Sequence, residues 1–257
     1  ICLNWGCIPS KALLRNAEVL SLFKRATEFG ITVDNIHPDF SKGVERSRKV
    51  VDRLTKGVAS LLRKNGVDVL SGAAHFIDPH TLNIEPGNQI IKSKNIIIST
   101  GGSPKTIPPL PIDGDTVVTY MQAIIQTEVP KAVVIVGGGA IGVEFASIYR
   151  SYGSDVTLVE MLPRILPNED EEISKHLERG LKKRGIKILT NSKVLGLTKS
   201  ESYAKIQVEK ENGAVELDCD RVLVAIGIQG NVEGIGLENI GVQSKSGFIL
   251  VPPSCNL

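Results

Sequence analysis

The sequence predicts an α/β fold, with a parallel sheet wound by helices over about residues 120–233. Two continuous apolar runs, AVVIV at 132–136 and DVTLVE at 155–160, are typical of strands buried on both faces. Segments with helical periodicity alternate with these runs, and a glycine-rich turn, GGGAIG, joins the first run to the helix that follows it. The order strand, helix, strand, helix, strand requires parallel pairing through right-handed crossovers.

Composition narrows the class of protein. The 257 residues are enough for two domains, 42% of them are apolar, and the formal net charge is +2. A charge this close to neutral predicts no nucleic-acid partner and no anionic membrane surface. No apolar run approaches the roughly 18 residues of a membrane-spanning helix. Four cysteines are too few for a disulfide scaffold, which favours an intracellular, cytoplasmic setting.

The first half of the chain predicts two helices and then short strands. Pro9 suits the first turn of a helix that ends near Gly30, and apolar residues at helical spacing predict a second helix over 40–63. Strand-like segments follow at 67–72, 81–84, 89–92 and 95–100. A proline-rich loop at 104–111 is typical of a connector between domains.

The second half supplies the rest of the parallel sheet. A helix runs from the glycine-rich turn to about Tyr152, and an amphipathic helix is expected over 169–185. A third strand follows at 185–190 and an antiparallel insert at 194–219. The run 221–227 returns as a central strand.

The glycine-rich turn predicts a dinucleotide site. Gly137 would make the tight turn, Gly139 would let a pyrophosphate approach the backbone, and Gly142 would let helix and strand pack closely. The phosphates would lie at the helix N-terminus. Glu160 ends the next strand, where an acid binds an adenosine ribose and repels a 2′-phosphate, so NAD is favoured over NADP. The alternative is a tight structural turn with a surface glutamate.

Cys2 and Cys7 form a pair at the start of the first helix. In a continuous helix their Cα atoms would lie roughly 8.7 Å apart, whereas a disulfide needs less than about 7 Å. A bond between them therefore requires a break, which Gly6 allows. Cys7 would then lie at a helix N-terminus near Lys11, and both features favour a thiolate. Two unpaired thiols packed as small apolar groups remain an equal alternative from spacing alone.

The run Cys2-Leu-Asn-Trp-Gly-Cys7-Ile-Pro-Ser-Lys11 resembles the redox-active segment of the flavin-dependent pyridine nucleotide–disulfide oxidoreductases. Ile-Pro-Ser-Lys-Ala-Leu-Leu is most similar to the dihydrolipoamide dehydrogenase branch, since glutathione reductases usually have Lys where Ser10 stands. The resemblance continues through STGG at 99–102, GGGAIGVE at 137–144, VTLVE with Arg164-Ile-Leu-Pro, and VLVAIG ending at Gly227. It covers nearly the whole chain, in family order.

The resemblance implies an enzyme with two cofactors, FAD and NAD, and no metal. Electrons would pass from protein-bound dihydrolipoamide to a Cys2–Cys7 disulfide, then to FAD, then as hydride to NAD⁺. Cys2 would be the interchange thiol and Cys7 the thiolate beside the flavin. Lys11 would pair with Glu144. The remaining cofactor contacts would come from Ala74, Thr100, Gly101 and Gly102 for FAD, and from Gly137, Gly138, Gly139, Ala140, Ile141, Gly142, Val143, Glu144, Glu160, Val194 and Gly227 for NAD.

The same resemblance implies a domain order and partners. Residues 1–119 would be an incomplete FAD-binding domain carrying the redox helix, 120–233 a Rossmann-like NAD-binding domain, and 234–257 a return segment toward the FAD or central domain. The partner would be a lipoyl domain of a 2-oxo acid dehydrogenase or glycine cleavage complex, and the full-length protein a homodimer. The setting would be cytoplasmic, or the mitochondrial matrix or plastid in a eukaryote.

The chain also departs from the family pattern. The upstream βαβ unit for FAD, the downstream flavin segment and the dimerisation domain with its His–Glu base are missing. The chain is therefore expected to be an internal section of an enzyme or a truncated relative, inactive alone. None of His37, His75, His80 and His176 has the His-Pro context of that base. Gly227-Ile-Gln-Gly-Asn231 replaces the usual Gly-Arg-x-Pro-Asn. The alternatives are a mercuric or glutathione reductase type, which Glu160 and Ser10 disfavour, and a non-catalytic nucleotide-binding module.

Overall fold

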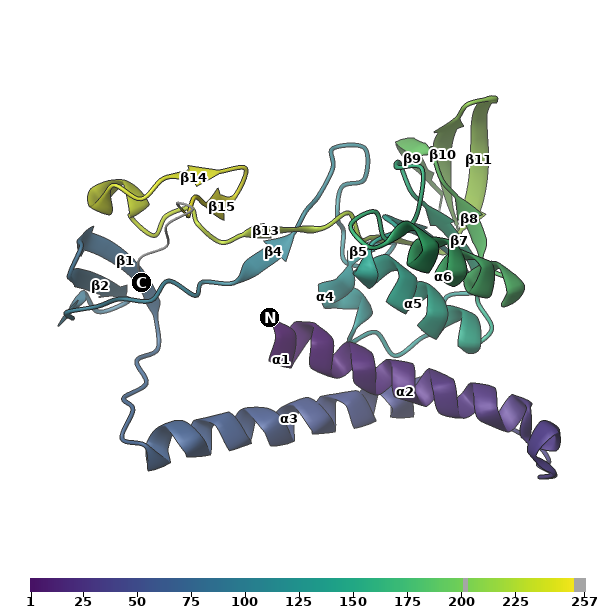
Figure 1. The fold of residues 1–257 in the computed structure, drawn as a ribbon, viewed down its shortest axis with the longest axis horizontal. Helices are drawn as coiled ribbons and strands as arrows, with labels where there is room; N and C mark the ends of the chain where they lie inside the picture. Colours follow the sequence, from purple (N-terminus) through teal and green to yellow (C-terminus); the bar gives the residue numbers. More distant parts are fainter. Residues whose placement is uncertain (201–202, 252–257) are drawn as a thin grey trace. The chain divides into compact units, whose positions relative to one another are not determined.

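The computed structural model describes residues 1–200 and 203–251 and divides into two compact units (Figure 1). Unit 1 comprises Ile1–Lys56 and Pro104–Gly227, and unit 2 comprises Gly57–Ser103 and Ile228–Leu257. Each unit is described by itself below.

Unit 1 is built on a parallel sheet of five strands. The order across the sheet is β5 (Val117–Thr119), β12 (Arg221–Val224), β6 (Ala132–Val136), β7 (Asp155–Val159) and β8 (Lys187–Leu189). Every neighbouring pair is parallel. The predicted α/β fold with a wound parallel sheet is therefore confirmed.

The two faces of this sheet are covered differently. One face packs on helices, including α4 (Tyr120–Ala123), α5 (Ala140–Ser151) and α6 (Glu171–Lys183), around a buried cluster that contains Ile135, Leu158 and Tyr149. The opposite face packs on an antiparallel insert of β9 (Lys193–Lys199), β10 (Ala204–Lys210) and β11 (Gly213–Cys219). Alternation of side chains along each strand explains the two cores, since Val134 and Val136 join the second cluster.

The N-terminal helices also follow the sequence pattern. They are α1 (Cys2–Trp5), α2 (Cys7–Lys24), the 3₁₀ turn η1 (Ala26–Phe29) and α3 (Phe40–Lys64). Gly30 ends η1 in the left-handed region with φ 70°, which glycine adopts without strain. The apolar stripe of α3 is buried at Val44 and Val51, but it becomes exposed toward the C-terminal end, where Leu61 is 60% accessible.

Unit 2 consists of short antiparallel pieces. A three-stranded sheet joins β1 (Ala73–Asp78), β2 (Thr81–Glu85) and β3 (Gln89–Lys92). The pair β4 (Gly102–Pro104) and β13 (Ile228–Gly230) follows, with η2 (Leu237–Ile240) and the hairpin β14 (Ser244–Lys245) and β15 (Phe248–Ile249). The Phe76 N–H donates to the Ile235 carbonyl at 2.8 Å, which ties the C-terminal segment to β1.

Two predicted strands are wrong. Residues 67–72 and 95–100 are irregular, although both runs are apolar and β-branched. A strand requires a neighbour for its N–H and C=O groups, and in the described part of the chain neither run has one. Val69 and Ile97 are consequently 68% and 89% exposed. The predicted return segment 234–257 is described only as far as residue 251, so Cys255 lies outside the described residues.

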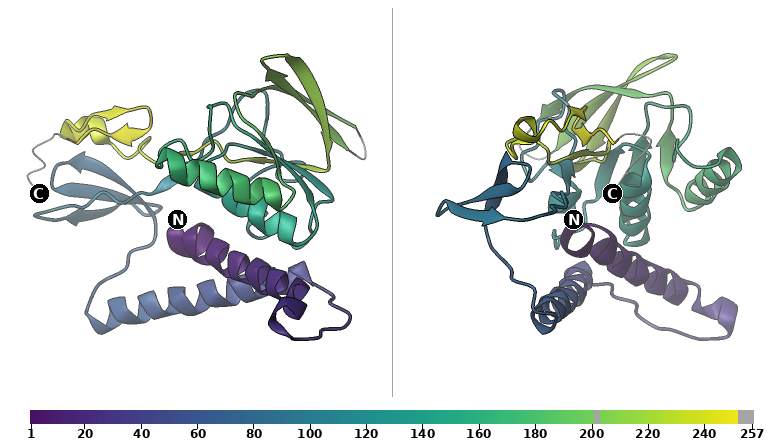
Figure 2. Two further views of the ribbon diagram at one scale, coloured as in Figure 1. Left: turned by 45° about the vertical axis from the view of Figure 1, so that its right-hand side comes forward. Right: turned by 60° about the vertical axis from the view of Figure 1, so that its left-hand side comes forward.

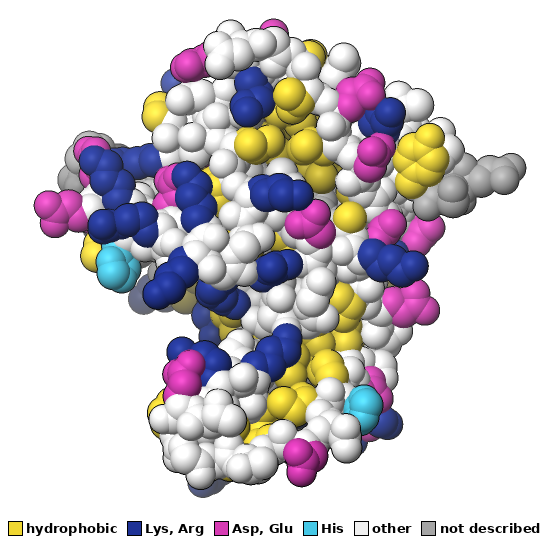
Figure 3. Space-filling view, turned by 90° about the vertical axis from the view of Figure 1, so that its right-hand side faces the viewer, with side chains coloured by type: hydrophobic (Ala, Val, Ile, Leu, Met, Phe, Trp, Pro, Cys, Tyr) yellow, Lys and Arg dark blue, Asp and Glu magenta, His cyan; other side chains and the backbone are white. Residues whose placement is uncertain are grey.

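The surface carries mixed charge. Figure 2 shows the ribbon in two further views, and Figure 3 shows Lys and Arg side chains across the middle of one face, with Asp and Glu side chains among them. Several surface charges form pairs within one helix, such as Lys56 with Asp52 and Lys182 with Glu178. Exposed pairs of this kind contribute at most about 1 kcal/mol each. No helix in residues 1–200 and 203–251 is long and apolar enough to cross a membrane.

Candidate functional site

Cys2 and Cys7 form a disulfide with their Cα atoms 4.7 Å apart. The helical backbone breaks between α1 and α2 at Gly6, whose φ and ψ are −128° and −115°. This break removes the roughly 8.7 Å separation that a continuous helix would impose. Cys7 is therefore the first residue of α2, at the positive end of the helix dipole, where a thiolate is stabilised after reduction.

Helix α3 holds the disulfide segment from one side. The guanidinium of Arg48 lies 5.6 Å from the centre of the Trp5 ring and donates to the Asn4 carbonyl at 2.8 Å. The Ser47 hydroxyl donates to the Pro9 carbonyl at 3.3 Å, at the start of α2. These contacts from α3 therefore fix the backbone on either side of Cys7.

Helix α2 lies along α5 in the same direction (Figure 1). Lys11, early in α2, forms an ion pair with Glu144, early in α5. Lys24, at the end of α2, donates to the Ser151 carbonyl at the end of α5, at 2.7 Å. The disulfide and the glycine-rich turn therefore lie at the same end of the helix pair. The ammonium of Lys11 is 61% exposed and the carboxylate of Glu144 is 23% exposed, so water reaches the pair.

Each glycine of the turn has a separate structural reason. Gly137 has φ 112°, and an added Cβ there would overlap the Ala225 carbonyl. An added Cβ at Gly142 would overlap the Gly137 carbonyl, so this glycine lets α5 pack close to the turn. Gly139 differs, because its φ is −75° and an added Cβ would meet no protein atom within 4 Å. The protein itself does not require glycine at 139, whereas a pyrophosphate approaching the N-terminus of α5 would.

Glu160 is buried directly after β7 and makes two backbone contacts. Its Oε2 accepts from the Gly138 N–H at 2.5 Å, and its Oε1 accepts from the Leu162 N–H at 2.8 Å. Each carboxylate oxygen keeps one further lone pair for a ribose hydroxyl. The Glu160 side chain thus stabilises the glycine-rich turn and also places a negative charge beside it.

The site lies at the carboxyl edge of the parallel sheet, where ligands bind in wound sheets. The turn follows β6, Glu160 follows β7, and Gly227, with φ 117°, follows β12. The Ser192 N–H donates to the Glu160 carbonyl at 2.9 Å. Ser192 also lines a cleft of about 340 Å³. The cleft is lined by Met161, Asn191, Ser192, Lys193, Glu209, Lys210 and Glu211.

Asn231 binds two of the unit 2 residues that are expected to contact flavin, Thr100 and Gly101. Its side chain donates to the Thr100 carbonyl and its N–H to the Gly101 carbonyl, both at 3.0 Å. Gly101 has φ 74°, and Gly102 begins β4. Ala74 lies separately in β1, opposite Ile84.

The remaining predicted site residues have different surroundings. Ala140 and Ile141 lie in the first turn of α5, where N–H groups have no helical acceptor. Val143 follows them, and its N–H already donates to the Gly139 carbonyl at 3.0 Å. Val194 is 6% exposed and packs in the second core, and it pairs with Val208 of β10.

Cys219 is the free cysteine of the described chain, and it belongs to the second core. Burial raises the pKa of its thiol to about 11, so the thiol is protonated and inert near neutral pH. No group of three or more His, Cys, Asp or Glu side chains that could hold a metal ion occurs among the residues that the structure describes.

Sequence reasoning missed the residues that hold the site in place. Arg48 acts on α1 from 44 residues away, and no local pattern marks that contact. Leu166 has its N–H bound to the Gly138 carbonyl at 2.8 Å. The run Arg164-Ile-Leu-Pro was the available signal for that contact, but its spacing alone does not indicate what it touches.

Comparisons with known proteins agree with this geometry. Residues 1–256 match the family model described as pyridine nucleotide-disulphide oxidoreductase. A dihydrolipoyl dehydrogenase of Chlorobaculum tepidum is 42% identical over 259 residues, which are 99% of this chain and 55% of that protein. The dihydrolipoyl dehydrogenase of Bacillus subtilis is 42% identical over 267 residues, 99% of this chain and 56% of that protein. The chain spans about half the length of the curated relatives it matches.

Solved structures give the same result. The HOCl-induced flavoprotein disulfide reductase RclA from Escherichia coli matches with a TM-score of 0.79 and 32% identity, over 98% of this chain and 53% of that one. LpdA from Mycobacterium tuberculosis matches with a TM-score of 0.86 over 98% of this chain and 55% of that one, and at 22% identity it supports the fold alone. The resemblance seen in the sequence is confirmed, and the chain belongs to the pyridine nucleotide-disulphide oxidoreductase family.

Proposed function

We propose that the chain carries the redox disulfide and nucleotide site of an FAD-dependent dihydrolipoamide dehydrogenase that reduces NAD⁺. The observation that carries this proposal is the shared end of α2 and α5. A disulfide begins one helix, the glycine-rich turn begins the other, and the Lys11–Glu144 pair joins them. The relatives that cover 99% of this chain and are named dihydrolipoyl dehydrogenase support the choice of substrate.

The chemistry at the cysteines is thiol–disulfide exchange. A thiolate of dihydrolipoamide attacks the Cys2 sulfur, the Cys2–Cys7 bond breaks, and Cys7 leaves as the thiolate. The second substrate thiol then attacks the mixed disulfide, which releases Cys2 as a thiol and the substrate as a cyclic disulfide. Two electrons and two protons leave the substrate. The cysteine pair receives both electrons, one proton stays on the Cys2 thiol, and the other goes to water. The N-terminus of α2 stabilises the Cys7 thiolate as it forms.

Bound FAD would supply the two-electron step between the reduced cysteines and the nicotinamide. Lys11 would hold a positive charge on the side of the disulfide, and Glu144 would keep the Lys11 ammonium in place. Thr100, Gly101 and Gly102 would offer backbone groups to the flavin, with their conformation set by Asn231.

The nucleotide would be NAD(H). Gly139 leaves space for the pyrophosphate, Ala140 and Ile141 offer free N–H groups, and Gly227 borders the turn from β12. The Glu160 carboxylate would accept from the ribose hydroxyls and repel a 2′-phosphate. The cleft of about 340 Å³ lined by Met161 and Ser192 would take the adenosine end of the ligand.

The wider setting belongs to the same proposal. The partner would be a lipoyl domain of a 2-oxo acid dehydrogenase or glycine cleavage complex, and the whole enzyme a homodimer. The low cysteine count fits the cytoplasm, or the matrix or plastid of a eukaryotic cell.

The test uses the full-length, flavin-loaded protein that contains this chain, with Cys2→Ser and Cys7→Ser each compared with the unchanged protein. Cys2→Ser should leave a Cys7 thiolate against oxidised flavin, visible as long-wavelength absorbance, and Cys7→Ser should lack that band. Both variants should lose lipoamide turnover while NADH still reduces the flavin. The buried Cys219→Ser is the matched control and should keep turnover.

Three outcomes would contradict the proposal. Normal turnover in Cys2→Ser would make the disulfide structural. Preference for NADPH over NADH would overturn the role of Glu160. Turnover of glutathione or mercuric ion in place of lipoamide would indicate a sister reductase, which the match to a flavoprotein disulfide reductase makes the second candidate.

A further inference from the structure

The loop that follows Glu160 lies directly against the glycine-rich turn. We define it as the 161–170 loop, between β7 and α6. Gly138 donates its N–H to Glu160 Oε2 at 2.5 Å, and its carbonyl accepts from the Leu166 N–H at 2.8 Å. Ile165 is fully buried, and an added Cβ at Gly138 would lie 3.0 Å from its side chain. Both backbone groups of Gly138 are therefore held by the segment around this loop.

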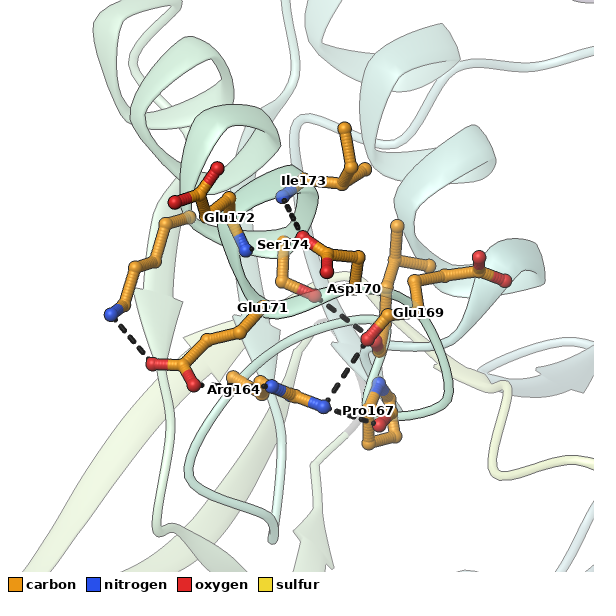
Figure 4. Close-up of polar contacts among 10 residues, drawn as sticks. Arg164, Pro167, Glu169, Asp170, Glu171, Glu172, Ile173 and Ser174 are labelled. Atoms are coloured by element: carbon orange, nitrogen blue, oxygen red, sulfur yellow. Dashed lines mark hydrogen bonds and ion pairs between the residues drawn. The ribbon is translucent and has the colours of Figure 1, made fainter.

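Arg164 holds the 161–170 loop in its folded shape (Figure 4). Its Nη2 donates to the Pro167 carbonyl at 2.9 Å and to the Glu169 carbonyl at 3.2 Å. Its Nη1 lies 3.8 Å from the Glu171 carboxylate, in the first turn of α6. One guanidinium thus bridges three points of the loop and helix, which a planar fork of donors does well.

A second contact holds the same loop from α6. The buried Ser174 hydroxyl donates to the Leu166 carbonyl at 3.0 Å. Leu166 has φ 46°, in the left-handed region, which is unfavourable for a residue with a side chain. A leucine stays there only where its surroundings hold it. Here its N–H is bound to Gly138 and its carbonyl to Ser174, so the strained residue is the link between α6 and the turn.

We propose that Arg164 is a positioning residue for the pyrophosphate of the dinucleotide. This inference rests on the proposed function, because it needs a nucleotide at the N-terminus of α5. Arg164 fixes the loop, Leu166 holds the Gly138 carbonyl, and Gly138 in turn fixes the plane of the peptide that leads into Gly139. The free N–H groups of the first turn of α5 then point where the phosphates bind, before any ligand arrives. Loss of Arg164 would let Leu166 relax and the turn rotate.

The test compares two ligands on the 257-residue chain. Arg164→Met keeps the length of the side chain and removes its donors. We expect the dissociation constant for ADP to rise about tenfold, because the preformed phosphate cradle is lost. The dissociation constant for adenosine, measured by NMR titration, should change less than about twofold because adenosine has no phosphate. Arg164→Lys can still donate to one carbonyl, so its dissociation constant for ADP should lie between those of the unchanged chain and Arg164→Met.

Arg179→Met is the matched control. Arg179 lies on exposed α6 and donates only to the Lys175 carbonyl of its own helix, at 3.3 Å, so ADP binding should not change. If Arg164→Met does not fold by near-UV circular dichroism, Ser174→Ala replaces it. That variant removes only the contact to Leu166, and the ADP dissociation constant should rise about threefold.

The outcomes separate the two claims. If the unchanged chain binds neither ADP nor NADH, the proposed function is wrong. If it binds both and Arg164→Met binds ADP equally well, the positioning role is overturned while the proposed function stands. Equal weakening of ADP and adenosine would also overturn the role, since it would show a general structural effect. For Ser174→Ala the same rule applies: weaker binding of ADP with unchanged binding of adenosine supports the role, and any other result overturns it.

Discussion

Unit 1 and unit 2 differ in how much of their apolar surface they bury. Unit 1 holds two clusters of buried side chains, one on each face of its parallel sheet. The buried apolar side chains described in unit 2 are Phe76, Ile84 and Leu237, each at least 5% exposed. Several large apolar side chains of unit 2 face solvent, with Ile97 at 89% exposure.

This difference in burial indicates which part of the site is stable without a bound ligand. Burial of apolar surface provides about 25 cal/mol per Å², so unit 1 has the larger source of stability. The disulfide, the Lys11–Glu144 pair and the glycine-rich turn all belong to unit 1. Residues 100–102, expected to contact flavin, belong to unit 2. We therefore expect the nucleotide site to be stable without flavin, and the flavin segment to depend on its ligand.

The largest expected effect is on the free energy of unfolding, and it distinguishes a glycine that the fold requires from a glycine that serves ligand binding. Gly142→Val should lower the free energy of unfolding by about 3 kcal/mol, because its side chain would overlap the Gly137 carbonyl. Gly139→Ala should cost less than about 1 kcal/mol, because its Cβ meets no protein atom, yet it should weaken NADH binding. Urea unfolding and NADH titration measure the two quantities. Equal loss of stability in both variants would remove the argument that Gly139 serves a ligand.

A second prediction uses Cys219 as a probe of the core of unit 1. With Cys255→Ser in the background and the disulfide intact, Cys219 should react with an aromatic disulfide reagent at pH 8 about a hundredfold more slowly than in the urea-unfolded chain. Burial raises its pKa to about 11, so the thiolate is scarce when folded. The rate should rise as pH increases toward 11, because deprotonation then becomes easier. Rapid modification at pH 8 would show that the second core opens.

The third prediction compares the two units by hydrogen exchange. Peptides from β6 and β7 should exchange at least tenfold more slowly than peptides from β1 to β3, because they lie between two cores. Addition of FAD should slow exchange at residues 98–104 more than in β7. Mass spectrometry of pepsin fragments gives both results. Equal protection in the two units would contradict the comparison.

The smallest effect is expected at the ion pair. Lys11→Ala should change the free energy of unfolding by less than about 1 kcal/mol, since an exposed pair is screened by water. In the flavin-loaded protein the same change should shift the flavin spectrum and slow electron exchange with the disulfide. Arg15→Ala, which breaks an exposed pair with Glu18 on the same helix, is the control. A large loss of stability with an unchanged spectrum would make the pair structural.

The sequence alone determined the features that depend on short-range patterns. Continuous apolar runs marked β6 and β7, glycine spacing marked the turn, and the need for a break between Cys2 and Cys7 pointed to Gly6. These succeed because strand burial, turn geometry and helix rise are set by residues close in sequence. Pattern alone failed at 67–72 and 95–100, where a strand needs a neighbour that no local signal supplies.

Only the tertiary structure decided which distant groups meet. Arg48 reaches Asn4, Lys24 reaches Ser151, and Leu166 reaches Gly138, each through packing of separate elements. The sequence offered Glu160 as a ribose ligand, but only the fold showed that its carboxylate also holds the backbone of the turn. The physical reason is that hydrogen bonds of this kind depend on positions fixed by the sheet and helices as a whole, not by the residues on either side.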